Sequence, residues 1–217
     1  LHYGFNEFII CAGYRQEFIK NYFAHYFLQT SDITFDFTGV HHREIHVTKY
    51  EPWKVTVVDT GLQTMTGGRI KRIAPYVGHE SFMLTYGDGV CDVPMDKLLE
   101  FHRNHGKICT MTAVKPEGRF GILDLEGDKI VSFREKSRQD VGYINGGYMV
   151  LEPEVFDYIE DDATVFEREP LEKLADAGEL MAYRHNGFWK CMDTMRDHQK
   201  LEELWKNGDA SWKVWAI

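Results

Sequence analysis

Residues 81–89 read Ser-Phe-Met-Leu-Thr-Tyr-Gly-Asp-Gly and join a short apolar run to an aspartate flanked by glycines. An apolar run of this length, bounded by turn residues, is typical of a buried strand. In open α/β sheets, ligands sit at the carboxyl ends of the strands. Asp88 is therefore a candidate metal ligand, and Gly87 and Gly89 let the backbone approach a phosphate or a sugar closely. The alternative is an ordinary turn, because Asp-Gly is a common turn pair.

On both sides of this stretch, strand-like runs alternate with amphipathic helical ones, which is typical of a mainly parallel sheet. We expect strands at residues 5–11, 33–37, 55–59, 81–86, 109–114, 121–125, 129–134, 143–151, 181–185 and 189–192. We expect helices at residues 17–27, 69–77, 94–105, 153–159, 170–177 and 194–207. The fold class predicted is α/β, with a Rossmann-like, mostly parallel but mixed sheet flanked by helices. We expect a single domain over residues 1–217, of which the part from about residue 150 is a C-terminal elaboration.

Composition narrows the function classes. The 217 residues carry a formal net charge of −9 and no block of lysine and arginine, which argues against a nucleic-acid groove. The cysteines Cys11, Cys91, Cys109 and Cys191 are scattered and form no C-x-x-C pair, so we expect free thiols in a reducing cytoplasm. No run of about 18 apolar residues occurs, so no membrane span is expected.

A second carboxylate, Asp193, follows the short strand expected at residues 189–192 and precedes Thr194 at a helix start. An aspartate in this place is often an ordinary helix N-cap. Taken with Asp88 it suggests a metal site, because Mg²⁺ is usually held by one or two carboxylates together with substrate phosphate oxygens.

Residues 64–69 read Thr-Met-Thr-Gly-Gly-Arg. Two glycines at a helix N-terminus expose backbone N–H groups and the positive end of the helix dipole, which suit an anion or a base edge. Arg69 adds a cation on the first turn.

Polar residues also flank the strands expected at residues 129–134 and 143–151. Glu135 and Lys136 end the first, and Asn145-Gly146-Gly147 opens the second. The glycines let a ligand lie close to the backbone, while the polar side chains could read hydroxyl and phosphate groups. The alternative for Glu135-Lys136 is a solvated surface pair.

Two further sets of residues have structural explanations. His41, His42 and His46 lie in a polar connection without cysteine partners, and we interpret them as a solvated loop rather than metal ligands. Trp212 and Trp215 lie in a tail too short to form its own core, which suggests packing on another subunit of a homo-oligomer.

The chain resembles the glucose-1-phosphate cytidylyltransferases, a branch of the sugar-nucleotide pyrophosphorylases, over nearly its whole length. The motifs that carry the resemblance are Glu51-Pro52-Trp53, Val57-Val58-Asp59-Thr60-Gly61, Met65-Thr66-Gly67-Gly68-Arg69, Tyr86-Gly87-Asp88-Gly89-Val90, Gly118-Arg119-Phe120-Gly121, Glu135-Lys136, Asn145-Gly146-Gly147 and Met192-Asp193-Thr194. The combination is specific, whereas several of the motifs are weak alone.

The resemblance implies that CTP and α-D-glucose 1-phosphate give CDP-glucose and pyrophosphate. It assigns Mg²⁺ to Asp88 and Asp193, and orientation of the attacking sugar phosphate to Lys136. The nucleotide side comprises Thr64, Gly68, Arg69 and Gly87, and the sugar-phosphate side comprises Glu135, Lys136, Arg138, Asn145 and Gly146. Arg138 stands where the family pattern has a lysine. Such transfers depend on positioning and charge neutralisation rather than on a nucleophilic side chain.

The chain departs from the family pattern at its start. Family members begin with a strand, a G-G-x-G-T-R loop and a lysine in a K-P-K-P-M run, and none of these occurs in the 217 residues, which open on Leu1. We therefore expect a fragment that lacks a βα unit of roughly 40 residues. Losing a triphosphate-cradling loop should cost at least ~10²–10³ in rate. Losing a central strand should cost about 10 kcal/mol, so we expect the chain alone to be marginally stable.

Two other functions stay open on the residues alone. A metal-dependent glycosyltransferase of related fold typically has a D-x-D pair, but the next aspartate after Asp88 is Asp92. A non-catalytic subunit that binds sugar phosphate would explain the absent loop, although it would not need both candidate metal aspartates. The identity of the nucleotide base, cytosine, and of the hexose, glucose, follows from the resemblance only.

Overall fold

The computed structural model describes residues 1–39, 41–48, 51–116, 121–126, 129–135 and 142–215. The chain divides into two compact units. The first unit contains residues 3–78 and 156–170, and the second contains residues 79–155 and those from 171 onward. The single domain expected from the sequence stays a prediction, and each unit is described by itself.

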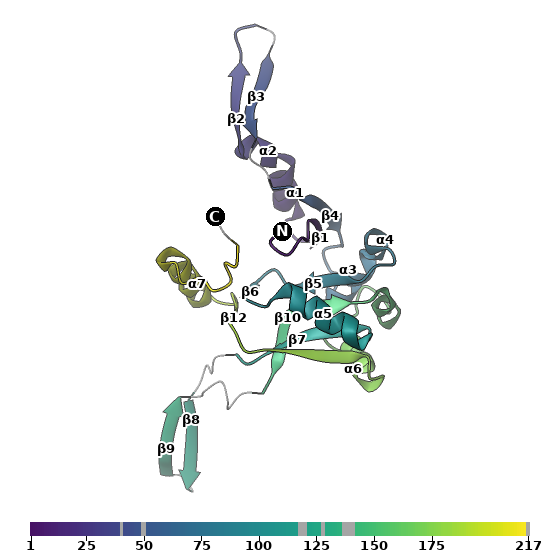
Figure 1. Cartoon of the computed structure of the whole chain (residues 1–217), viewed down its shortest axis with the longest axis vertical. Coiled ribbons are helices and arrows are strands. Elements are labelled where there is room, and N and C mark those ends of the chain that lie inside the picture. Colours follow the sequence, from purple (N-terminus) through teal and green to yellow (C-terminus); the bar gives the residue numbers. More distant parts are fainter. Residues whose placement is uncertain (40, 49–50, 117–120, 127–128, 136–141, 216–217) are drawn as a thin grey trace. The chain divides into compact units, whose positions relative to one another are not determined.

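The first unit is built on two parallel strands, β1 (Glu7–Ala12) and β4 (Lys54–Asp59), paired from Glu7 opposite Lys54 to Ala12 opposite Asp59 (Figure 1). The unit also contains α1 (Gln16–Ala24), α2 (Tyr26–Gln29), β2 (Ser31–Asp36), β3 (His42–Thr48), α3 (Thr66–Arg72) and α4 (Ala74–Val77). Because β1 and β4 are parallel, their carboxyl ends lie at the same edge, where the segment that leads into α3 begins.

The structure corrects three expectations in this unit. The helix expected at residues 17–27 is split into α1 and α2 at His25. The helix expected at residues 69–77 begins earlier, at Thr66, and is interrupted at Ile73, because Pro75 cannot donate a helical hydrogen bond. The polar connection that holds His42 and His46 is not a loop, since both lie on β3, which forms an antiparallel hairpin with β2.

The second unit is built on a four-stranded mixed sheet in the order β11-β7-β10-β5 (Figure 1). Its strands are β5 (Phe82–Thr85), β7 (Cys109–Val114), β10 (Ile144–Leu151) and β11 (Leu180–His185). β11 is parallel to β7, whereas β10 is antiparallel to both β7 and β5. Three strands thus run one way and β10 runs against them, which confirms the mixed α/β sheet.

Shorter elements complete the chain. They are β6 (Gly89–Cys91), α5 (Met95–His105), β8 (Gly121–Glu126), β9 (Lys129–Glu135), a 3₁₀ helix (Pro153–Tyr158), α6 (Glu169–Asp176), β12 (Trp189–Cys191) and α7 (Met195–Asn207). β8 and β9 form a hairpin, and β6 pairs antiparallel with β12. The 3₁₀ helix replaces the α-helix expected at residues 153–159, and β6 was not expected.

The core of the second unit lies between α5 and the sheet. Leu98 of α5 and Val150 of β10 are fully buried and share a cluster with Val93. Burying a leucine or valine side chain contributes about 1.5–3 kcal/mol. This packing fixes the sheet whose strand β5 leads into the Gly87-Asp88-Gly89 turn.

The cysteines agree with the sequence analysis. All four are free thiols, as expected. Burial raises the pKa of Cys109 to about 12, so that this thiol stays protonated at neutral pH. None of the helices in the described ranges is long and apolar enough to cross a membrane.

A histidine network connects α5 to β7. The Lys107 N–H donates to His105 Nδ1 over 2.9 Å, so Nδ1 carries no proton and Nε2 donates to Thr110 Oγ1 over 2.7 Å. His102 Nδ1 lies 2.7 Å from the same hydroxyl. Burial first, and then the charges of His102 and Lys107, lower the pKa of His105.

This network predicts a pH dependence of stability. Because the folded pKa of His105 lies below its unfolded value of about 6.5, the unfolded state binds more protons between the two values. The stabilising contribution is fully present above the unfolded pKa and is lost as the pH falls through the folded pKa. We expect the melting temperature of His105→Gln to fall less than that of the wild type between about pH 7.5 and 5. Equal falls in thermal melts of the two proteins would contradict this role.

Candidate active site

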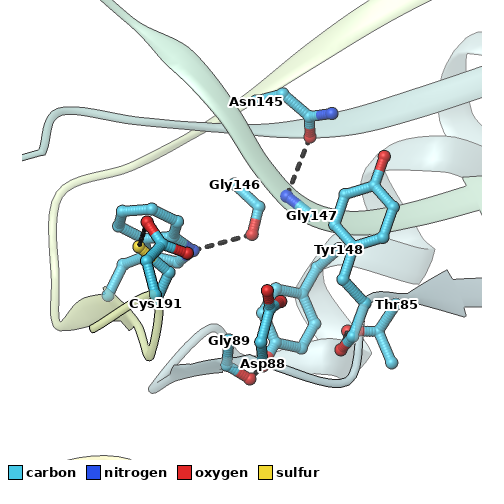
Figure 2. A pocket seen from close by; sticks show the side chains of 11 residues that line it. Thr85, Asp88, Gly89, Asn145, Gly146, Gly147, Tyr148 and Cys191 are labelled. Atoms are coloured by element: carbon cyan, nitrogen blue, oxygen red, sulfur yellow. Dashed lines mark hydrogen bonds between the residues drawn. The ribbon is translucent and has the colours of Figure 1, made fainter. Parts of the chain in front are cut away.

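Three segments of the second unit meet around a pocket of about 170 Å³. They are the turn after β5, the start of β10 and the end of β12. The residues that line the pocket are Thr85, Tyr86, Asp88, Gly89, Asn145, Gly146, Gly147, Tyr148, Trp189, Cys191 and Asp193. Figure 2 shows Asn145, Gly146 and Gly147 on one side of the pocket, with Asp88 and Gly89 on the other.

The short ladder of β6 and β12 brings the two predicted metal aspartates together. Cys191 pairs with Gly89, and beyond this pair the Met192 N–H donates to the Asp88 carbonyl oxygen over 2.7 Å. Asp193 is the next residue after Met192, so this hydrogen bond joins the backbone beside Asp193 to that of Asp88. Both aspartates are exposed to solvent at the pocket.

Asp193 is not the N-cap of the following helix. The N-cap of α7 is Thr194, whose Oγ1 accepts from the Asp197 N–H over 3.2 Å, while the Asp197 carboxylate accepts from the Thr194 backbone N–H. This capping box satisfies the helix start without Asp193. The Asp193 Oδ2 accepts instead from the Cys191 thiol, at an S···O distance of 3.1 Å. The alternative that Asp193 is an ordinary helix N-cap is therefore wrong.

The donor set at the pocket fits a hard divalent cation. Asp88 and Asp193 offer carboxylate oxygens, which are the ligands that Mg²⁺ prefers, with substrate phosphates completing the coordination. Within the described ranges, no three His, Cys, Asp or Glu side chains are grouped to hold a metal by themselves. The pair of aspartates therefore suits a metal that is shared with a substrate.

A bulge in β10 shapes the opposite side of the pocket. The register between β10 and β7 shifts after Asn145, and the Asn145 Oδ1 accepts from the Gly147 N–H over 2.8 Å. A Cβ on Gly146 would lie 2.9 Å from Val114 Cγ1, and one on Gly147, where φ is 78°, would lie 2.6 Å from the Tyr86 ring. Both glycines are required by these contacts, and bulges of this kind often occur beside active sites.

Arg69 lies at the carboxyl ends of β1 and β4 in the first unit. Its Nη1 donates to Thr60 Oγ1 over 2.8 Å, and a Cβ on Gly13 would lie 2.6 Å from the same nitrogen. Thr64, in the same unit, is buried. The carboxyl ends of parallel strands are where α/β proteins bind ligands, so a cation here suits a phosphate.

The glycine pair before Arg69, Gly67 and Gly68, serves to pack the helix and does not expose backbone N–H groups as expected. The N–H groups of Gly67 and Gly68 donate to the Thr164 carbonyl oxygen at 3.0 and 3.4 Å, so they are used within the protein. A Cβ on Gly68 would lie 2.6 Å from Asp162 Cα. These glycines allow α3 to pack against the backbone of residues 162–164, and the expectation of exposed N–H groups at this helix start is wrong.

The structure describes the remaining predicted residues less fully. Gly87 has open space around the position that a Cβ would take. Glu135 ends β9, but its side chain lies outside the described parts, as do Lys136, Arg138 and the motif at residues 118–120. Their roles stay predictions.

Two aromatic residues of the pocket were missed by the sequence analysis. The Tyr148 hydroxyl donates to the Gly89 carbonyl oxygen over 2.6 Å, and the Trp189 Nε1 donates to the Gly146 carbonyl oxygen over 2.7 Å. From the sequence, both were only parts of expected strands, at residues 143–151 and 189–192. Buried Tyr and Trp usually find a partner for their polar group, and this is the signal that could have identified them.

The comparisons with known proteins agree with this site. The family model described as nucleotidyl transferase matches residues 43–206. Glucose-1-phosphate cytidylyltransferase of Salmonella typhi is 52% identical over 214 residues, which are 98% of this chain and 83% of that protein. A probable glucose-1-phosphate cytidylyltransferase of Bacillus subtilis is 42% identical over 217 residues, which are 99% of this chain and 84% of that protein.

Solved structures share the fold at low sequence identity. HddC of Yersinia pseudotuberculosis, complexed with GMP-PN, has a TM-score of 0.65 at 22% identity, covering 94% of this chain and 80% of that one. A UDP-glucose pyrophosphorylase complexed with UDP-glucose has a TM-score of 0.62 at 12% identity, covering 95% of this chain and 83% of that one. The chain belongs to the nucleotidyl transferase family, and within it to the glucose-1-phosphate cytidylyltransferases.

Proposed function

We propose that the protein transfers CMP from CTP to α-D-glucose 1-phosphate, giving CDP-glucose and pyrophosphate, with Mg²⁺ as its metal. The observation that carries the proposal is the β6–β12 ladder, which holds Asp88 and Asp193 together at a pocket. The 52% identity to the Salmonella typhi glucose-1-phosphate cytidylyltransferase supports the choice of base and sugar.

In this reaction a phosphate oxygen of glucose 1-phosphate forms a bond to the α-phosphorus of CTP. The bond from that phosphorus to the bridging oxygen breaks, and pyrophosphate leaves with the electron pair. Mg²⁺, when bound by Asp88 and Asp193, would neutralise charge on the attacked phosphate. Lys136 would orient the attacking oxygen, so that catalysis depends on position and charge rather than on a covalent intermediate.

The other residues divide between the two substrates. The nucleotide would be contacted by Thr64, Arg69 and Gly87, and the sugar phosphate by Glu135, Arg138, Asn145 and Gly146. Gly68 is not proposed as a contact, because it packs against the backbone of Asp162. The cation of Arg69 at the strand ends suits a nucleotide phosphate. The bulge at Asn145-Gly146 suits a sugar that lies close to the backbone.

We also propose that the protein acts in the cytoplasm and forms a homo-oligomer. Four free cysteines suit a reducing compartment. Trp205 and Trp215 are 48% and 45% exposed, which is unusual for tryptophan and suits burial against a second copy.

The test is pyrophosphate release with Mg²⁺ and glucose 1-phosphate, using CTP, UTP, GTP and dTTP in turn. It is run on the 217-residue chain and on a chimera that carries a family N-terminal segment before Leu1. We expect release with CTP, at least ~10²-fold faster than with the other nucleotides, in a form that contains the triphosphate loop. If a folded chimera released no pyrophosphate with any of the four nucleotides, the result would favour a sugar-phosphate-binding subunit instead.

A further inference from the structure

The two aspartates are carried by a ladder that is too small to hold them by itself. β6 and β12 have three residues each and form a separate two-stranded sheet. Isolated two-stranded ribbons are marginally stable in water. Catalytic groups, however, must be held within about 0.5 Å of their productive positions. Some other contact must therefore fix the ladder.

Two side-chain hydrogen bonds connect this ladder to β10, one for each of its strands. Tyr148 of β10 donates to the Gly89 carbonyl oxygen on β6, next to Asp88 (Figure 2). Trp189 of β12 donates to the Gly146 carbonyl oxygen in the β10 bulge. β10 itself is an interior strand of the four-stranded sheet. The ladder is thus tethered on both strands to a strand whose position is fixed by two neighbours.

The chemistry of both donors suits a permanent tether. Burial raises the pKa of Tyr148, so its hydroxyl keeps its proton and remains a donor. The indole N–H of Trp189 is a donor at every pH. The tyrosine ring lies against Gly89, since its Cε2 would be 3.9 Å from a Cβ at that position, an ordinary van der Waals distance.

Separate hydrogen bonds hold the end of the ladder that lies away from the two aspartates. The Asp92 N–H donates to the Phe188 carbonyl oxygen over 3.1 Å, and His185 Nε2 lies 2.7 Å from Asp92 Oδ1. A Cβ on Gly187 would lie 2.4 Å from the same carboxylate oxygen. Trp189 pairs with Cys91 at this same end, whereas Tyr148 bonds to Gly89 at the aspartate end. Because the contacts of Asp92 remain when either tether is removed, each removal should loosen the ladder without unfolding it.

We propose that Tyr148 and Trp189 are positioning residues for the metal site: they hold Asp88 and Asp193 at the spacing that lets both carboxylates bind one divalent cation. This inference rests on the proposed function, because it takes these two aspartates as the ligands. Outer groups that orient metal ligands typically contribute 10–100-fold to metal affinity.

The test compares Tyr148→Phe and Trp189→Phe with the wild type. Each substitution keeps an aromatic ring and removes one donor. Mn²⁺ is titrated as the probe, with CDP-glucose present to supply phosphate oxygens, and its binding is followed by electron paramagnetic resonance, which does not depend on turnover. Tyr183→Phe, a tyrosine of β11 outside the pocket, is the matched control. Thermal melts of all four proteins separate loss of affinity from loss of fold.

We expect Tyr148→Phe and Trp189→Phe each to bind Mn²⁺ about 10-fold more weakly than the wild type. The control Tyr183→Phe should bind Mn²⁺ as the wild type does. In the form that turns over, kcat should fall with little change in the KM for glucose 1-phosphate. Wild-type affinity and kcat in both variants would overturn the positioning role and leave the proposed function intact. Catalysis by a wild type that binds no Mn²⁺ would overturn the two-aspartate site, and the positioning role with it.

Discussion

Replacing Asp88 by asparagine is expected to lower the rate of CMP transfer by about 10²–10³-fold, and replacing Asp193 to lower it by a similar factor. An amide keeps the size of the carboxylate but removes the negative charge that holds a divalent cation against the attacked phosphate. Because both side chains would bind one ion, the double variant should lose little more than either single variant. Rates of pyrophosphate release at saturating CTP measure this directly.

Asp209→Asn is the matched control, since Asp209 is an exposed aspartate beyond the end of α7 and outside the pocket. It should keep the wild-type rate. If Asp88→Asn were as active as this control, the ligand assignment would be wrong. If the losses of the two single variants multiplied in the double variant, the aspartates would act separately rather than on one ion.

Gly68→Ala is expected to destabilise the protein by about 3 kcal/mol, at the upper end of the usual cost of overpacking. A Cβ on Gly68 would lie 2.6 Å from Asp162 Cα and 2.8 Å from Asp162 O. Both atoms belong to the backbone, so they cannot rotate away as the end of a side chain would. The helix α3 would have to move, and Arg69 with it.

Urea unfolding of Gly68→Ala and of Gly39→Ala measures this effect. A Cβ on Gly39 meets no atom within 4 Å, and this glycine belongs to the same unit. The control should therefore keep the wild-type midpoint. Because Arg69 would contact the nucleotide, we also expect a raised KM for CTP in Gly68→Ala. Equal midpoints in the two variants would contradict the close packing of α3.

Two strands of the main sheet, β7 and β10, could be predicted because most of their side chains are buried. β7 occupies residues 109–114, as expected, since its sequence, CTMTAV, contains no charged residue and no turn residue. β3 could not be predicted in this way. Its sequence, HREIHVT, is largely polar because the strand belongs to a two-stranded hairpin, so it gives no run of buried residues. β6 could not be predicted either, because it has only three residues and follows a turn.

The candidate site could be predicted in part. Asp88 and Asp193 were identified because each follows a strand, and the structure brings them together through β6 and β12. The tethers from Tyr148 and Trp189 join residues 59 and 43 positions apart, and no local pattern encodes such pairs. Gly68 was identified for the wrong reason, because the neighbour that requires a glycine is a backbone segment about a hundred residues away.

The most direct test of the proposed CMP transfer is product analysis after incubation with CTP, glucose 1-phosphate and Mg²⁺. Mass spectrometry of the mixture should find CDP-glucose and pyrophosphate in equal amounts, because one phosphorus–oxygen bond forms for each one that breaks. Formation of both products only when the family N-terminal segment precedes Leu1 would still agree with the proposed reaction. A parallel incubation contains CDP-glucose and an acceptor sugar. Release of CDP there, with no pyrophosphate formed from CTP in the first incubation, would contradict the proposed reaction and indicate a glycosyltransferase.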